Sequence, residues 1–154
     1  MNSPCDHLRI DGDRLMRRLV ELATIGPIEG GGSSRLALTD EDREGRDLVT
    51  TWMRDLGLDV RIDGIGNVVA TRPGRTDGPA VMTGSHIDTV RSGGRYDGNL
   101  GVLAGLEVIE TLIDAGVETE HPIAVAFFTD EEGARFPPDM LGSLVYVGGL
   151  GLEE

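Results

Sequence analysis

The chain has 154 residues, 39% of them apolar, and its 27 acidic and 14 basic residues give a formal net charge of −13. That charge argues against a nucleic-acid partner, because phosphate backbones are bound through clustered positive charge. No apolar run approaches the roughly 20 residues that a membrane-spanning helix needs, so we expect no membrane partner.

Residues 1–12 are predicted to form a flexible tail. They are polar and acidic, and they contain neither the basic nor the apolar segment of a secretory signal. The single cysteine, Cys5, lies in this tail and can form no internal disulfide. These features predict a cytoplasmic protein whose domain occupies residues 13–154.

Two helices are predicted in the first third of the chain. Apolar residues recur every three or four positions over residues 13–25, and Gly26 is the expected stop. A second helix is expected over residues 40–56, where Thr39 and Asp42 resemble a capping box and acidic residues fill the first turn.

The remainder of the chain alternates strands and one long helix. Residues 58–74 read as a hairpin, residues 79–90 as a short strand ending in a loop, residues 99–115 as a helix, and residues 121–133 as a buried strand. Strand, helix and buried strand in this order predict a βαβ unit. We therefore expect an α/β fold with a mixed, mostly parallel sheet flanked by helices. No closing helix is expected in the last fourteen residues.

Polar residues follow both strands of the predicted βαβ unit. His86 and Asp88 end the first strand, and an acidic run at residues 130–132 follows the second. Functional groups of open α/β sheets collect beyond the carboxyl ends of the strands, so these residues are expected to share one rim. Asp97, at the start of the long helix, lies within reach of the same rim.

These residue types suit a metal site with an acid–base residue. Imidazole nitrogen and carboxylate oxygen are zinc ligands, which makes His86, Asp97 and Glu132 candidates. The carboxylate of Asp88 can accept the other N–H of the imidazole. In the adjacent pair that Glu131 forms with Glu132, one residue can bind metal while its neighbour acts as general base. Each motif alone is more often structural, and their common order at strand ends carries the hypothesis.

Three stretches, GSHIDTVRSGGRYDGNLGVLAGLEV, FFTDEEGARF and MLGS, resemble the amidase family of hydantoinase/carbamoylase type. This di-zinc family contains N-carbamoyl-L-amino-acid hydrolases, allantoate amidohydrolases and β-ureidopropionases. It belongs to the wider superfamily of aminoacylases and zinc carboxypeptidases. The upstream stretch GGSSRLALTDEDREGRD is also similar to the family's N-terminal region, so the resemblance covers the chain from about Asp11 onward.

The resemblance implies a role for each candidate residue. His86 would bind one metal ion, Asp97 would bridge two, and Glu132 would bind the second. Asp88 would orient His86, and Glu131 would be the general base for a metal-bridging water. The two divalent ions would be zinc, with manganese or cobalt suited to the same ligands. The implied substrate is a small N-carbamoyl, ureido or linear amide compound whose non-peptide C–N bond is cleaved.

Family members are considerably longer than this chain, and the resemblance implies that the full-length protein is a homodimer. The resemblance implies two further histidine ligands beyond residue 154, and an inserted domain that supplies dimer contacts and a substrate-binding arginine. His7, in the tail, and His121, at the entry of a strand, are poorly placed as substitutes. We therefore expect an incomplete catalytic domain with weak metal binding and little activity from this chain alone.

Two alternatives remain open at this point. One is a dipeptidase or deacetylase of the same superfamily, but that branch carries a lysine two residues after the bridging aspartate. Here that position is Asn99, and all 14 basic residues of the chain are arginine. The other alternative is a non-catalytic remnant or a partner subunit of a split enzyme.

Overall fold

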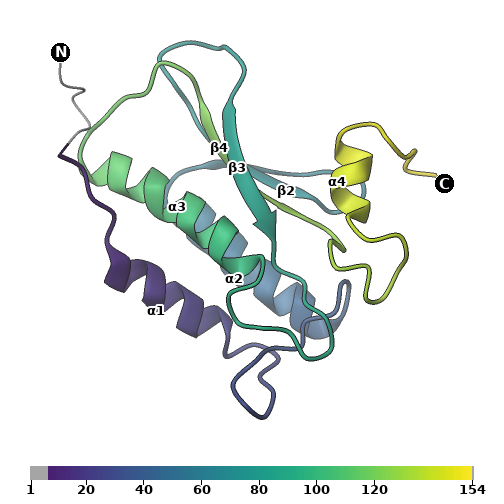
Figure 1. Cartoon of the computed structure of the whole chain (residues 1–154). Coiled ribbons are helices and arrows are strands. Elements are labelled where there is room, and N and C mark those ends of the chain that lie inside the picture. Colours follow the sequence, from purple (N-terminus) through teal and green to yellow (C-terminus); the bar gives the residue numbers. More distant parts are fainter. Residues whose placement is uncertain (1–6, 154) are drawn as a thin grey trace.

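A four-stranded mixed sheet lies at the centre of the computed structural model, which describes residues 7–153 (Figure 1). The strands are β1 (Asp59–Ile62), β2 (Val68–Arg72), β3 (Val81–His86) and β4 (Ile123–Phe128). Their order in the sheet is β1-β2-β4-β3. Residues 1–6, which include Cys5 and half of the predicted tail, lie outside the described residues.

The direction of the strands differs in part from the expectation. The mixed sheet is confirmed, but β1 with β2 and β2 with β4 pair antiparallel, and only β3 with β4 is parallel. The described sheet is therefore not mostly parallel. A short connection joins β1 to β2 and makes that pair antiparallel, whereas the helix that crosses from β3 to β4 makes that pair parallel.

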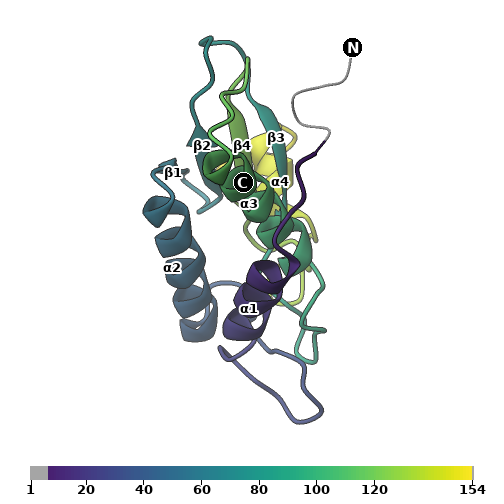
Figure 2. The same cartoon turned by 90° about the vertical axis from the view of Figure 1, so that its left-hand side faces the viewer.

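Four helices accompany the sheet within residues 7–153, namely α1 (Gly12–Leu22), α2 (Asp40–Asp55), α3 (Asn99–Asp114) and α4 (Leu141–Tyr146). The first three lie together on one face of the sheet, and α4 lies on the other (Figures 1 and 2). α4 was not expected from the sequence, and its edge-to-face ring contact between Tyr146 and Phe128 of β4, at 5.4 Å, helps to hold it. No helix within residues 7–153 is long and apolar enough to cross a membrane.

The helix ends follow the predicted signals with small differences. α1 ends at Leu22, three residues before the predicted end, and Gly26 instead forms a turn in which its carbonyl accepts the Ser34 N–H. At the start of α2, the Thr39 side chain accepts the N–H of Asp42, as a capping box requires. The reciprocal bond differs, because the Asp42 carboxylate accepts the N–H of Leu38.

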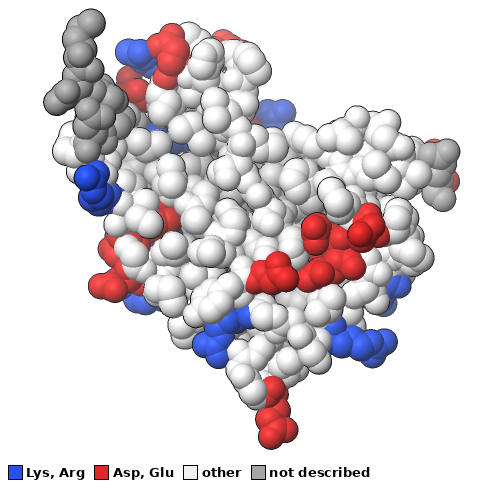
Figure 3. Space-filling model, in the orientation of Figure 1, with Lys and Arg blue, Asp and Glu red and all other residues white. Residues whose placement is uncertain are grey.

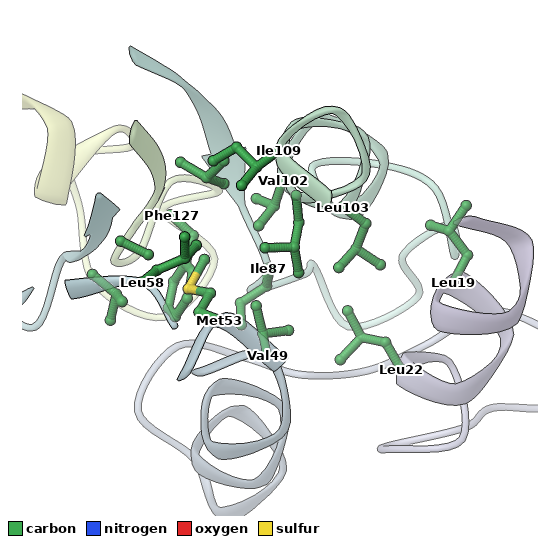
Figure 4. Close-up of a cluster of buried hydrophobic side chains, with 14 of the residues drawn as sticks. Leu19, Leu22, Val49, Met53, Leu58, Ile87, Val102, Leu103, Ile109 and Phe127 are labelled. Atoms are coloured by element: carbon green, nitrogen blue, oxygen red, sulfur yellow. The ribbon is translucent and has the colours of Figure 1, made fainter. Parts of the chain in front are cut away.

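One hydrophobic core lies between the sheet and helices α1, α2 and α3 (Figure 4). Its fully buried members include Leu19, Leu22, Val49, Met53, Leu103, Leu106, Ile109, Val68, Ala70, Val125 and Phe127. Ile87, the residue directly after β3, belongs to the same cluster. The end of β3 is therefore anchored in the core, and this fixes the backbone of His86 and Asp88 on either side of Ile87.

A buried ion pair joins α1 to α3. The Glu107 carboxylate of α3 is fully buried and accepts hydrogen bonds from Arg14 Nε (2.7 Å), Arg14 Nη2 (2.8 Å) and the backbone N–H of Asp11. Arg14 also pairs with Asp114, whose side chain is 60% exposed. This network fixes the first helix across the long helix of the βαβ unit.

Candidate active site

The parallel pairing of β3 and β4 creates the site. In the register of this pair His86 lies beside Phe128, so both strands deliver their carboxyl ends to one rim of the sheet. The acidic residues 130–132 follow β4 there, and Asp97 comes just before α3. The shared rim predicted from the sequence is therefore present. Figure 3 shows acidic side chains gathered over this part of the surface.

His86 is the central residue of this rim. Its ring is nearly buried, and Nε2 lies 3.3 Å from Glu131 Oε2 and 3.9 Å from Asp97 Oδ1. The other ring nitrogen, Nδ1, lies 2.9 Å from the backbone carbonyl of Asp88. Because a carbonyl only accepts, this contact places the proton of the neutral ring on Nδ1. The Nε2 lone pair then faces the carboxylates and is the one available for a metal ion.

Asp88 is buried, and it contacts the His86 ring mainly through its backbone carbonyl and not, as the sequence had suggested, through the carboxylate. The nearer of its contacts with the His86 ring is made by its carbonyl, whereas its carboxylate Oδ1 lies 3.8 Å from Nδ1. The carboxylate oxygens instead accept the backbone N–H groups of Glu131 and Glu132, both at 3.3 Å. Asp88 thus connects the end of β3 to the turn that carries the two glutamates.

Gly98 allows Asp97 to approach His86. Its φ is +63°, in the left-handed region that favours glycine, and a Cβ there would lie 2.5 Å from Cε1 and Nε2 of the His86 ring. Any larger residue would therefore displace the imidazole or the backbone. This explains the glycine after Asp97 as a requirement of the site, beyond its effect on the turn.

Burial and neighbouring carboxylates disfavour the charged form of Glu132. Burial raises the pKa of Glu132, and the charges of Asp97, Glu131 and Asp88 act in the same direction, opposed by His86. Behind the rim, Asp130 is 1% exposed, and burial together with the charge of Asp88 raises its pKa to about 6. The sequence had marked Asp130 only as part of an acidic run, because nothing in the run shows which acid turns inward.

The donor types suit a metal ion, and the structure brings the candidate ligands His86 and Asp97 close together without a complete ligand set. Bonds of 2.0–2.2 Å in a tetrahedral zinc site place two ligand atoms roughly 3.4 Å apart. The separation from His86 Nε2 to Asp97 Oδ1, both candidate ligands, is 3.9 Å, somewhat longer than this. Within residues 7–153, however, no group of three or more His, Cys, Asp or Glu side chains is close enough to hold a metal ion. No ion pair within 4.0 Å joins Glu132 to His86 in this part of the chain.

The other marked residues lie away from the rim or support it. His121 precedes β4 at the opposite end of that strand, and His7 is exposed at the start of the described chain. Gly142, for which the sequence suggested no role, packs its backbone against β4. A Cβ on Gly142 would lie 2.3 Å from Asn67 Oδ1 and 2.5 Å from Thr129 N. Sequence alone offered no signal for Asn67, whose side chain joins Thr129 to Gly142.

Comparison with known proteins gives consistent matches. A model of peptidase family M28 matches residues 67–150. An N-carbamoyl-L-amino-acid amidohydrolase of Rhizobium meliloti is 47% identical over 154 residues, which are 99% of this chain and 37% of that protein. A ureidoglycolate hydrolase of Arabidopsis thaliana is 36% identical over 152 residues, which are 96% of this chain and 31% of that protein.

Comparison with solved structures gives a match of the same kind. A hydantoinase/carbamoylase family amidase from Burkholderia ambifaria matches with a TM-score of 0.93 and 54% identity, over 96% of this chain and 37% of that one. The resemblance drawn from the sequence motifs is therefore confirmed. The chain spans about a third of the length of the relatives that it matches.

Proposed function

This chain belongs to peptidase family M28, and from that premise we propose that it supplies part of the two-metal site of an amidohydrolase. The bond cleaved would be a non-peptide C–N bond of an N-carbamoyl amino acid or ureido compound. The observation that carries the proposal is that the carboxylates of Asp97 and Glu131 each lie within 3.9 Å of His86 Nε2, at the carboxyl ends of β3 and β4.

Each residue of the rim has a proposed task. His86, Asp97 and Glu132 would hold two divalent ions, with Asp97 shared between them, and zinc, manganese and cobalt all suit these donors. Such ions, when bound, supply Lewis acidity toward water and the substrate carbonyl. Asp88 would keep His86 and the two glutamates in register through its carbonyl and carboxylate.

Glu131 is the proposed general base. Its side chain is 35% exposed, so a water molecule can reach it, whereas its backbone N–H is held by Asp88. The carboxylate would accept a proton from the water that attacks the carbonyl carbon and would return it to the departing nitrogen as the C–N bond breaks.

The substrate class is inferred from the names of relatives that match nearly the whole of this chain. Their names describe hydrolysis of N-carbamoyl-L-amino acids and ureidoglycolate, both small molecules with a ureido group. We assign dimer contacts and the binding of the substrate's carboxylate to the part of the relatives that this chain does not span. We also propose a cytoplasmic location.

Calorimetric titration with zinc and manganese tests the metal site directly. We expect binding by the wild-type chain that is lost in His86→Ala, because that variant removes the ligand nitrogen. His121→Ala is the matched control, since His121 lies at the opposite end of β4. Equal binding by wild type and His86→Ala would contradict the proposed site. Parallel assays of an N-carbamoyl-L-amino acid and ureidoglycolate then test the substrate class, with weak or no turnover expected from this chain alone.

A further inference from the structure

Arg35 is the largest fully buried side chain of the described structure, and the proposed reaction does not use it. It lies between the glycine-rich segment that follows α1 and the start of α2. A buried guanidinium is costly unless its donors are paired, so its partners indicate what it holds in place.

The guanidinium joins three separate segments of the chain. Its Nε donates to the carbonyl of Ile87 (3.2 Å), and its Nη2 donates to Oδ1 of Asn99 (3.0 Å). Its Nη1 donates to the carbonyls of Leu22 (3.2 Å) and Ile25 (3.1 Å) at the end of α1. The planar group therefore fixes the loop after β3 and the start of α3 relative to α1.

The backbone of Arg35 is bound to the same loop. Its N–H donates to Thr89 Oγ1 at 2.7 Å, and its carbonyl accepts the N–H of Thr89 at 2.9 Å. Thr89 directly follows Asp88. Main chain and side chain of Arg35 thus both hold the segment in which His86 and Asp88 lie.

Two of the residues that accept hydrogen bonds from Arg35, Ile87 and Asn99, lie close in sequence to candidate metal ligands. Ile87 lies between His86 and Asp88, and its side chain is packed among Val49, Val102 and Leu103 of the core (Figure 4). Asn99 lies two residues after Asp97 and is bonded to it through the backbone at 2.6 Å. A shift of either acceptor would change the separation of 3.9 Å between His86 Nε2 and Asp97 Oδ1.

The surroundings of Arg35 hold its side chain in one place. Burial lowers the pKa of the guanidinium, and the charges of Asp42 and Asp88 oppose that shift without cancelling it. Gly45, inside α2, leaves the necessary room, because a Cβ there would lie 3.1 Å from Arg35 Cδ. Glycine in a helix interior costs about 1 kcal/mol relative to alanine, and here the space that it leaves is filled by Arg35.

We propose that Arg35 is a positioning residue that sets the separation of His86 and Asp97. It touches neither substrate nor metal, and it acts through Ile87 and Asn99. The inference rests on the proposed function, since it concerns the ligands named there.

Arg35→Lys tests the proposal because it keeps the charge and loses the planar fork. A single ammonium group cannot donate at once to Ile87, Asn99 and the two carbonyls of α1. We expect cobalt(II) affinity, measured by calorimetry and by the visible absorption of the bound ion, to fall by about tenfold or more. In the metal-free protein, amide hydrogen exchange of residues 87–99 should become faster.

Matched controls separate positioning from general destabilisation. Ile109→Val and Ile109→Ala remove a smaller and a larger part of a core side chain far along α3. The control is whichever of the two has a melting temperature nearer to that of Arg35→Lys. We expect it to leave the cobalt affinity and the hydrogen exchange of residues 87–99 near wild type. Equal effects in Arg35→Lys and these controls would overturn the proposal.

Two further results are decisive. If Arg35→Lys does not fold, Asn99→Ala keeps the arginine and removes one of its acceptors, and unchanged cobalt affinity in that variant would overturn the proposal. If the wild type binds no cobalt, the proposed function fails for this chain while the exchange experiment still decides the role of Arg35. Unchanged protection of residues 87–99 in Arg35→Lys would then refute it.

Discussion

Asp130 shows how a single buried residue can make stability depend on pH. Its pKa is raised from 3.8 to about 6, first by burial and then by the charge of Asp88. The native state therefore retains a proton that the unfolded chain has already released in this interval. Raising the pH from about 4 to about 6 should lower the free energy of unfolding by about 2–3 kcal/mol through this residue.

Asp130→Asn should remove that dependence. Asparagine tolerates the left-handed conformation of this residue, whose φ is 54°, and it cannot ionise. We expect urea unfolding of the variant to show a shallower decrease in the free energy of unfolding between pH 4 and 7 than the wild type shows. Parallel pH curves for the two proteins would show that Asp130 does not titrate in this range.

Gly98 offers a test of the site that leaves every candidate ligand in place. Gly98→Ala puts a methyl group 2.5 Å from the His86 ring at a residue with positive φ. We expect zinc affinity in calorimetry to fall by about tenfold or more. Gly94→Ala is the control in the same loop, because a Cβ there meets nothing within 4 Å. Wild-type zinc affinity in Gly98→Ala would mean that the ring and Gly98 are not in close contact.

At the scale of elements, the Glu107 carboxylate is the buried centre of the ion-pair network that joins α1 to α3. Glu107→Ala removes the acceptor of the Arg14 fork and of the Asp11 N–H from a fully buried position. Because the donors are left without their partner, we expect a loss of about 3 kcal/mol in the free energy of unfolding. Thermal and urea denaturation measure this change.

Asp114→Ala is the control for that network. Asp114 also pairs with Arg14 at 2.7 Å, but its side chain is 60% exposed. An exposed pair contributes little, so the loss should stay below about 1 kcal/mol. Equal losses in the two variants would show that burial of Glu107 does not determine the strength of the network.

At the scale of the whole molecule, the edge strand β3 and much of one face of the sheet are exposed in the described structure. β3 pairs only with β4, and its Val81 is 63% exposed. On the face that carries α4, a broad hollow is lined by the apolar side chains of Val69, Met82 and Ala124 together with charged residues that include Arg61 and Asp77. An exposed edge strand with apolar residues favours association between chains.

Val81→Lys should therefore weaken self-association. We expect concentration-dependent association of the wild type in analytical ultracentrifugation, and a rise of about tenfold in the dissociation constant for the variant, because a charge is placed on the pairing edge. Val108→Lys is the control, since Val108 is exposed on α3, away from any strand edge. Association that is equally weakened by both substitutions would indicate a general effect of charge.

The local elements of this protein are determined by its sequence. Periodic leucines, the Thr39 cap and the glycines after helices predict α1, α2 and α3 within a few residues, because these signals act over one or two turns. The strand–helix–strand order also predicts the parallel β3–β4 pair and hence the rim where His86 and Glu131 meet. α4 escaped prediction because its position depends on contacts with Asn67 and Phe128, far away in sequence.

The tertiary structure alone decided what surrounds the predicted site. The antiparallel pairing of β2 with β4 results from how the β1–β2 hairpin packs against β4, and no local sequence pattern predicts it. The same holds for Asp88 binding the backbone of both glutamates and for Arg35 joining α1 to the loops after β3 and before α3. Sequence specifies residue types and short-range geometry, whereas burial of a charge or a contact across 50 residues exists only once the core has assembled.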